Sequence, residues 1–151
     1  MIDITTISAI VTTGSVIVGV AFTLLEIRHF NKTRKTEIIM KIYDRFGSRE
    51  IVEAMNMVGA SKFENLNDYR EKYGLTDVTE IAVLFDGIGV LLEQKLIDID
   101  MVDRLFGTTV YLLWSRIDPV IKAMRKGLNE PSFFAHFENL MEKLNEHRKP
   151  K

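Results

Sequence analysis

The sequence predicts an all-α protein in which one N-terminal transmembrane helix continues into a cytoplasmic multi-helix bundle. Residues 4–25 contain no charged side chain, and a helix of that length rises about 33 Å, enough for a hydrocarbon core of about 30 Å. Downstream, apolar residues recur at helical spacing, and no stretch alternates as a strand does. The predicted parts are listed by residue: 1–26 a transmembrane anchor, 27–46 a basic juxtamembrane helix, 47–147 a cytoplasmic helical domain and 148–151 a polar tail.

The uncharged run has two other interpretations. A cleaved signal peptide is disfavoured because Asp3 takes the place of a basic n-region, the run is long and no A-x-A site follows it. A core or partner-bound helix stays possible, because seven serine and threonine hydroxyls make the run only moderately hydrophobic. We favour the membrane span on its length and lack of charge.

Basic residues flank the run on one side only, and they set its orientation. Arg28, Lys32, Arg34 and Lys35 follow the run, and no lysine or arginine precedes it. Basic flanks stay inside, so we expect a single-pass protein of the cell membrane with its N-terminus outside and its C-terminal domain cytoplasmic. The same four side chains are expected to contact lipid headgroups, or only to fix topology. The absence of cysteine suits a reducing cytoplasm.

The first helix is expected to continue past the membrane, because residues 26–46 contain neither proline nor glycine. Gly47 then stops it, and Ser48 caps a second helix that ends near Gly59. A short charged and aromatic segment follows at residues 67–73.

The most apolar downstream helix is predicted at residues 77–96, capped by Thr76. Val83 and Val90 lie opposite its main apolar face, which predicts a helix covered on two sides. The residues expected to form the core of the domain are Phe85, Ile88, Leu92 and Trp114.

Three more helical segments are predicted towards the C-terminus. Asp98 caps a short helix to Phe106 that Gly107 breaks, and Pro119 predicts a kink or a fresh start within residues 108–126. The last helix opens at residues 129–131, and the tail from His147 is expected to fray. The apolar face of this last helix comprises Phe133, Phe134, Phe137, Leu140, Met141 and Leu144.

A resemblance rests on these elements. The stretch Phe85-Asp86-Gly87-Ile88-Gly89-Val90-Leu91, with Leu96-Ile97-Asp98, Leu105-Phe106-Gly107 and Trp114, resembles an uncharacterised prokaryotic family. Its members are single-pass membrane proteins with a small cytoplasmic helical domain of unknown function. The resemblance implies this architecture and supplies no catalytic residues.

No pattern predicts catalysis, a metal or another cofactor. The single E-x-x-H, Glu26 to His29, lacks the second copy and the extra glutamates of a di-iron bundle. Asp86 and Glu93 share a helix face, where they could hold a cation, pair with Arg116 or form a plain polar stripe. The aspartates at positions 98, 100 and 103 lack the glycine and distal glutamate of a calcium loop. Neither nucleic acid nor a small-molecule substrate is indicated.

A polar stripe runs along the predicted span. Its members lie within one arc of the helix and are spaced by threes and fours, which predicts a helix–helix interface. The predicted helix-packing residues are Ser8, Thr12, Ser15, Gly19 and Thr23. Alternatively, the hydroxyls bond back to carbonyls of their own helix, or the stripe lines a hydrated pore.

These observations favour a non-enzymatic, membrane-anchored helical module that acts by association. Its expected partners are membrane lipid and either copies of itself, as a homo-oligomer, or the subunits of a larger membrane complex to which it is an accessory. The alternative is an oligomeric pore or membrane effector, with a Ser/Thr-lined span gated by the bundle.

Overall fold

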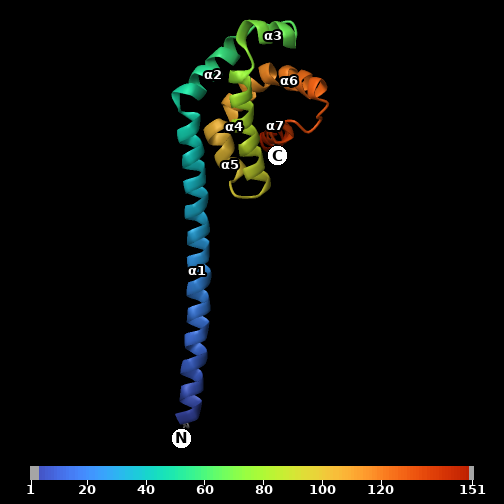
Figure 1. The fold of residues 1–151 in the computed structure, drawn as a ribbon. Coiled ribbons are helices and arrows are strands. Elements are labelled where there is room, and N and C mark those ends of the chain that lie inside the picture. The colour runs from blue at the N-terminus through green and yellow to red at the C-terminus, as the bar shows by residue number, and fades with distance from the viewer. Residues whose placement is uncertain (1–3, 150–151) are drawn as a thin grey trace. The chain divides into compact units, whose positions relative to one another are not determined.

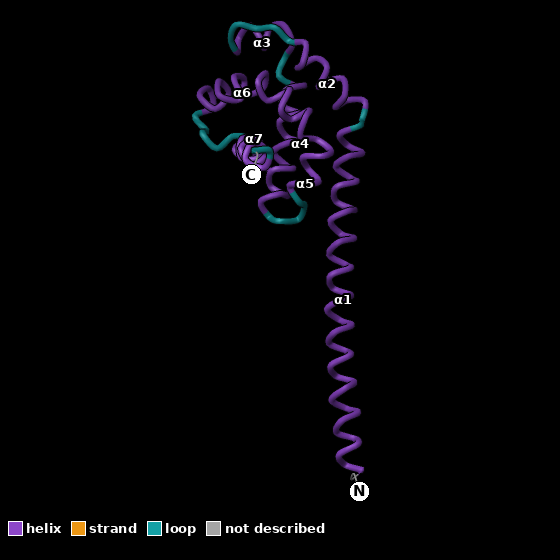
Figure 2. The backbone as a smooth tube through the Cα atoms, turned by 180° about the vertical axis from the view of Figure 1, so that it is seen from behind, coloured by secondary structure: helices purple, strands orange, loops and turns teal. Residues whose placement is uncertain are grey.

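The computed structural model describes the backbone of residues 4–149 and the side chains of residues 15–149. Within this part of the chain every element is helical (Figures 1 and 2), which confirms the all-α prediction. The elements are α1 (Ile4–Phe46), α2 (Arg49–Ala60), α3 (Leu66–Tyr73), α4 (Thr76–Glu93), α5 (Ile99–Val102), the π-helical turn η1 (Asp103–Gly107), α6 (Thr108–Leu128) and α7 (Ala135–His147).

The chain divides into two compact units, residues 1–37 and residues 38–151. The first unit contains most of α1, and the second contains the last turns of α1 together with all later helices. Among the residues that the structure describes, no helix is both long and apolar enough to cross a membrane. The predicted span begins at residue 4, and the side chains of residues 4–14 are outside the part of the chain that the structure describes.

The core of the second unit is built around α4. This helix packs against α7 on one side and α2 on another, and Phe85 and Ile88 are almost fully buried. The Phe85 ring stacks on Phe137 of α7 at 5.1 Å, and Trp114 of α6 meets the same ring edge-on at 4.9 Å. The predicted core is confirmed for Phe85 and Ile88, while Leu92 and Trp114 pack half-buried at its margin.

Two residues of α4 hold α7 close. A Cβ atom on Gly89 would lie 2.2 Å from the backbone carbonyl oxygen of His136, so only glycine permits this approach. The Asp86 carboxylate accepts a hydrogen bond of 3.0 Å from the backbone N–H of Phe137. That N–H belongs to the first turn of α7, where a helix has no internal acceptors for its donors. Asp86 therefore caps α7 from a neighbouring helix.

Helix α4 ends at Glu93, before the predicted end at residue 96. Lys95 has a φ of 57°, and the N–H of Leu96 donates back to the carbonyl of Leu91 at 3.0 Å. This is the usual left-handed helix terminator, with lysine where glycine is preferred. At its other end the helix already includes Thr76, which is its first residue rather than its cap.

The predicted break at Gly107 is wrong. The backbone continues from α5 through η1 into α6. A Cβ atom on Gly107 would collide with the carboxylate of Asp103 and the guanidinium of Arg148, so the glycine makes room for this ion pair. The fresh start at Pro119 is also wrong, since α6 runs through it. Pro119 and Ser115 are both exposed, so water can solvate the Ser115 carbonyl that loses its helical donor.

The last helix begins at Ala135, later than predicted. Phe134 adopts a left-handed φ of 56° at the N-cap position of α7, where the turn that follows Asn129 ends. The tail also makes contacts that its composition did not predict. His147 Nε2 lies 3.0 Å from the carboxylate of Asp100, and Arg148 Nε donates to Asp103 at 2.7 Å. On the predicted apolar face, the fully buried residues are Phe137, Leu140, Met141 and Leu144.

Candidate functional site

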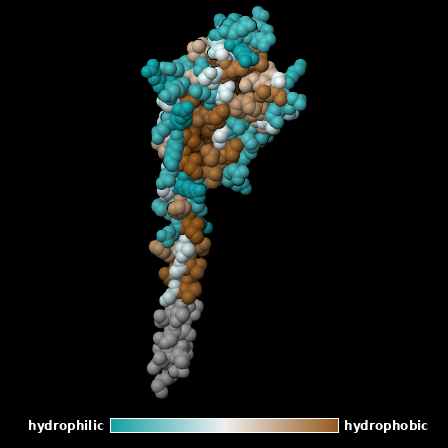
Figure 3. All heavy atoms as spheres, in the orientation of Figure 1, coloured by the Kyte–Doolittle hydropathy of each residue, from teal (hydrophilic) through white to brown (hydrophobic). Residues whose placement is uncertain are grey.

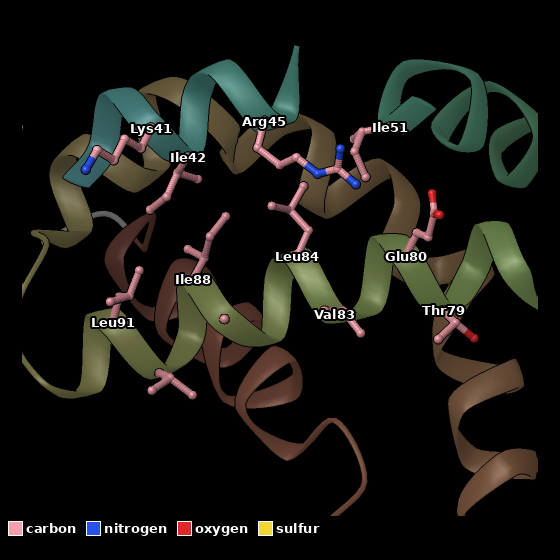
Figure 4. A pocket seen from close by; sticks show the side chains of 12 residues that line it. Lys41, Ile42, Arg45, Ile51, Thr79, Glu80, Val83, Leu84, Ile88 and Leu91 are labelled. Carbon is pink, nitrogen blue, oxygen red and sulfur yellow. The ribbon is translucent and has the colours of Figure 1, made fainter. Parts of the chain in front are cut away.

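An open apolar groove lies in the second unit, between the last turns of α1 and helix α4. It has a volume of about 720 Å³ (Figure 4). Ile42 lines it from α1 and Ile51 from the start of α2, and α4 supplies the rest of its apolar wall. These α4 residues are Val83, Leu84, Gly87, Ile88, Val90 and Leu91. Figure 3 shows hydrophobic surface on this face of the unit.

The groove exists because α4 is apolar on two faces and the bundle covers only one of them. Phe85 on the inner face is 0% exposed, whereas Val83 is 57% and Val90 36% exposed. The prediction that α4 is covered on two sides is therefore wrong for the Val83 and Val90 side. Gly87 lies between these valines, and a Cβ atom there would meet nothing within 4 Å.

Charged side chains stand at the ends of the groove. In Figure 4, Lys41 of α1 and Leu91 of α4 lie across from each other at one end, and Glu80 and Thr79 of α4 lie at the other end. Arg45 lies between them and pairs with Glu50 at 3.4 Å. Within the described residues, neither Lys41 nor Glu80 has an ion-pair partner. The groove thus carries opposite unpaired charges at its two ends.

The predicted helix-packing stripe lies on α1. The side chains of Ser8 and Thr12 are outside the described residues. Gly19 has open space around it, since an added Cβ would meet nothing within 4 Å. The Thr23 hydroxyl donates to the Gly19 carbonyl at 2.8 Å, which is the back-bonding that the sequence left open for this stripe. Ser15 and Thr23 are exposed.

The predicted headgroup residues lie further along α1. Arg28, Lys32 and Arg34 are exposed, and Lys35 is half-buried. The large apolar side chains that precede and adjoin them are also exposed, each between 51% and 68%. These side chains are Val16, Ile17, Val18, Val20, Phe22, Leu24, Leu25, Ile27 and Phe30.

Two acidic groups of α4, Asp86 and Glu93, make hydrogen bonds to residues of α7. Glu93 accepts hydrogen bonds from the Asn139 amide at 3.1 Å and from His136 Nδ1 at 3.0 Å. These two hydrogen bonds hold the pKa of the Glu93 carboxyl below its ordinary value, and the bond from Asn139 contributes more than the bond from His136. Asp86 caps α7. The suggested partner Arg116 instead donates to the carbonyl of Ser61 at 3.3 Å.

Groups of three or more histidine, aspartate or glutamate side chains with metal-binding spacing are absent from the described residues. Of the three aspartates near α5, Asp98 takes the N-cap position, while Asp100 and Asp103 face His147 and Arg148. Contacts with these two basic side chains account for Asp100 and Asp103.

One largely covered cation, Arg125, was not predicted from the sequence. The Arg125 side chain is 15% exposed and donates to the Glu138 carboxylate at 2.7 Å. It also donates to the carbonyls of Phe133 at 2.8 Å and Phe134 at 3.3 Å. These contacts fix the turn between α6 and α7. No spacing could have shown them, because they depend on the left-handed backbone at Phe134.

The comparisons with known proteins identify a family without an assigned activity. Residues 13–144 match the model of a domain of unknown function, DUF4760. Neither the curated proteins nor the solved structures contain a significant match to the chain. The match confirms the resemblance to an uncharacterised family, and it covers α1 from residue 13, the groove and α7 as far as residue 144. The chain therefore belongs to the DUF4760 family.

Proposed function

We propose that the protein is a non-enzymatic helical module, anchored in the cell membrane through α1, that acts by association with other protein chains. One observation carries this proposal. The large apolar side chains between Val16 and Phe30 are all at least half exposed. Exposed apolar surface on this scale marks contact with a membrane or another protein.

The distribution of these side chains favours lipid as the main cover. Val16, Ile17 and Val18 are consecutive, so they point about 100° apart around the helix axis. A single partner helix covers one stripe, whereas a helix that is apolar all round requires apolar surroundings on every side. The exposed Arg28, Lys32 and Arg34 at the end of this segment support an anchor with its basic end at the cytoplasmic surface.

The groove on the second unit supports association. It is apolar and open, and it lies apart from the polar contacts that join α4 to α7. Binding in such a groove requires no reacting group. The Ser/Thr stripe would add a second contact inside the membrane, between copies or with subunits of a larger complex.

The anchor is tested by extracting the full chain from membranes with alkaline carbonate. The double variant Val18→Lys, Phe22→Lys places two charges in the apolar segment, each costing about 2.5–3.5 kcal/mol at the centre of a bilayer. The matched control, Thr33→Lys with Glu37→Lys, makes two lysines on the same helix beyond that segment. We expect the native chain and the control to stay in the pellet and the first variant to wash off. A native chain released by carbonate contradicts the anchor.

Orientation is tested with single cysteines, because the native chain has none. Ile2→Cys is expected to react with a membrane-impermeant maleimide in intact cells, and Asn145→Cys, at an exposed position of α7, only after lysis. Labelling of Asn145→Cys in intact cells contradicts a cytoplasmic C-terminal domain.

A further inference from the structure

We propose that the groove binds an amphipathic helix of a different protein, and that this helix carries an acidic and a basic residue eleven positions apart, with apolar residues between them. This inference rests on the proposed function, association with other protein chains, for which it names the kind of partner and the surface. Three features of the groove support it: its apolar floor, the open space above Gly87 and the charges at its ends.

The apolar floor of the groove has a form that suits a helix. Val83, Gly87 and Val90 are spaced i, i+4 and i+7, so they lie along one face of α4. Both valines are exposed, and Ile42 of α1 lines the facing wall (Figure 4). Hydrophobic grooves of this kind accept the apolar face of an amphipathic helix. A small apolar ligand would instead need to be buried over most of its surface, which an open floor does not provide.

Gly87 allows another backbone to come close at the centre of this floor. An added Cβ atom there would meet nothing within 4 Å, whereas at Gly89 it would collide with the carbonyl oxygen of His136. The space above Gly89 is therefore filled by α7 of the same chain, and the space above Gly87 is open. Glycine permits close approach of a neighbouring backbone, so a helix from another chain can lie against α4 at this point.

The charges at the ends of the groove indicate the charges of the partner. Figure 4 places Lys41 across from Leu91 at one end and Glu80 at the other, and neither charge has an ion-pair partner within the described residues. The third charge, Arg45, is already paired with Glu50. An acidic residue facing Lys41 and a basic residue facing Glu80 would compensate both free charges. Opposite charges across an interface select the partner and its register.

The separation of these two charges sets the spacing on the partner. Glu80 and Leu91 are eleven positions apart on α4, which is a rise of about 16 Å. In a second helix that lies along α4, residues i and i+11 have the same rise and differ by only about 20° around the axis, so both face the groove. Acidic residues favour the N-terminal end of a helix and basic residues the C-terminal end. The partner helix therefore runs antiparallel to α4.

A second copy of the chain does not supply such a helix. Within the described residues, no single helix carries an acidic and a basic side chain eleven positions apart. A membrane lipid is also a poorer match, because its headgroup lies at one end of the acyl chain and would leave either Lys41 or Glu80 without a counter-charge. A helix of another protein can meet both charges and cover the apolar floor between them.

The charge pattern is tested with three synthetic helical peptides and the full chain in nanodiscs of neutral lipid. Each peptide has leucine at positions i+4 and i+7, and its charges at i and i+11 are glutamate and lysine, two glutamates or two lysines. Binding is measured by fluorescence anisotropy, with the signal of empty nanodiscs subtracted. We expect the native chain to prefer the glutamate–lysine peptide, Lys41→Glu the two-lysine peptide and Glu80→Lys the two-glutamate peptide, each by about threefold to tenfold. Any other order of preference, equal affinities or no binding overturns the proposal.

The place of the contact is tested by filling the space above Gly87. Gly87→Leu adds a side chain at the centre of the groove, and Gly59→Leu makes the same change at an equally open position of α2. Neither added Cβ atom meets the bundle, so we expect both variants to fold, which the fluorescence of Trp114 checks. Binding of the glutamate–lysine peptide should weaken by about tenfold in Gly87→Leu alone. Equal binding by the two variants shows that the peptide lies elsewhere and overturns the proposal.

The native partner is tested in cells by photo-cross-linking of the full chain. Benzoylphenylalanine takes the place of Val83 in the groove or, as the control, of Leu112, which is 66% exposed on α6. The cross-linked segment is then sequenced by mass spectrometry. We expect Val83 to capture a helix of another protein with an acidic and a basic residue eleven positions apart.

The contrary outcomes separate the groove from the proposed function. A segment of this same chain, a lipid, a helix without the charge pattern, equal capture at both positions or no adduct at Val83 overturns the inference. Capture of another protein at Leu112 alone refutes the groove contact and leaves association standing. No capture at either position, together with a particle that has the mass of a single chain, refutes association as well.

Discussion

Replacement of Gly89 by alanine adds a single methyl group at the point where α4 and α7 are closest. The new Cβ would lie 2.2 Å from the carbonyl oxygen of His136 and 2.7 Å from its carbonyl carbon. Both are backbone atoms and cannot rotate away. Helix α7 must therefore shift outward by roughly 1 Å, in an interior packed as densely as an organic crystal.

The cost follows from what that shift disturbs. Overpacking in a core costs about 1–3 kcal/mol. The shift also stretches the hydrogen bond from the Phe137 N–H to Asp86, now 3.0 Å, and a bond to a charged group contributes about 1.5–3 kcal/mol. Alanine gains about 1 kcal/mol over glycine in a helix interior. We expect Gly89→Ala to lower the free energy of unfolding by about 2–3 kcal/mol.

Gly87→Ala is the matched control in the same helix. It meets nothing within 4 Å, so only the gain in helix propensity applies, and we expect stabilisation of about 1 kcal/mol. Urea unfolding of the full chain in mild detergent is followed by the fluorescence of Trp114, the only tryptophan, which touches Phe137 of α7. Titrations at two protein concentrations separate folding from association. If Gly89→Ala is as stable as Gly87→Ala, the close packing of α4 on α7 is incorrect.

Three other substitutions test the contacts that shape the bundle, by the same urea titration. Arg125→Ala removes the guanidinium that pairs with Glu138 and donates to the carbonyls of Phe133 and Phe134, and a loss of about 3 kcal/mol is expected; a loss no larger than that of the exposed Arg104→Ala contradicts the bridging role. Lys95→Gly relieves a left-handed lysine at the end of α4, so stability should rise by about 1 kcal/mol, and a fall would refute the cap. The folded pKa of Glu93 lies below its ordinary value of 4.5, so its stabilisation is present above pH 4.5 and is lost as pH falls through the folded pKa. Native stability should therefore drop more steeply in acid than that of Glu93→Gln, and parallel pH profiles would show that this contact is negligible.

The helical class and much of the core could be predicted from apolar periodicity. Phe85, Ile88, Phe137 and Leu140 are buried as their spacing indicates. Helix ends were harder to predict. Lys95 and Phe134 take left-handed backbone without being glycine, so no glycine in the sequence marks these two positions. The backbone stays helical at Gly107, where the missing side chain leaves room for the ion pair between Asp103 and Arg148. A residue that usually breaks helices therefore does not break one here.

The groove left a signal in the sequence that periodicity alone could not resolve. Val83 and Val90 stood off the main apolar face, which correctly marked a second apolar surface on α4. Periodicity does not show whether such a surface meets another helix of the same chain or is left open. The structure leaves it open within the described residues. Lys41 and Glu80 are far apart in the sequence, and only the fold places their charges at opposite ends of one groove.

The mass of the native particle tests the central claim, a membrane-anchored module that associates through this groove, most directly. The full chain is extracted from membranes with mild detergent, and its mass is measured by light scattering with the detergent contribution subtracted. We expect a particle that contains more than one polypeptide chain. A particle with the mass of a single chain would contradict the proposed association.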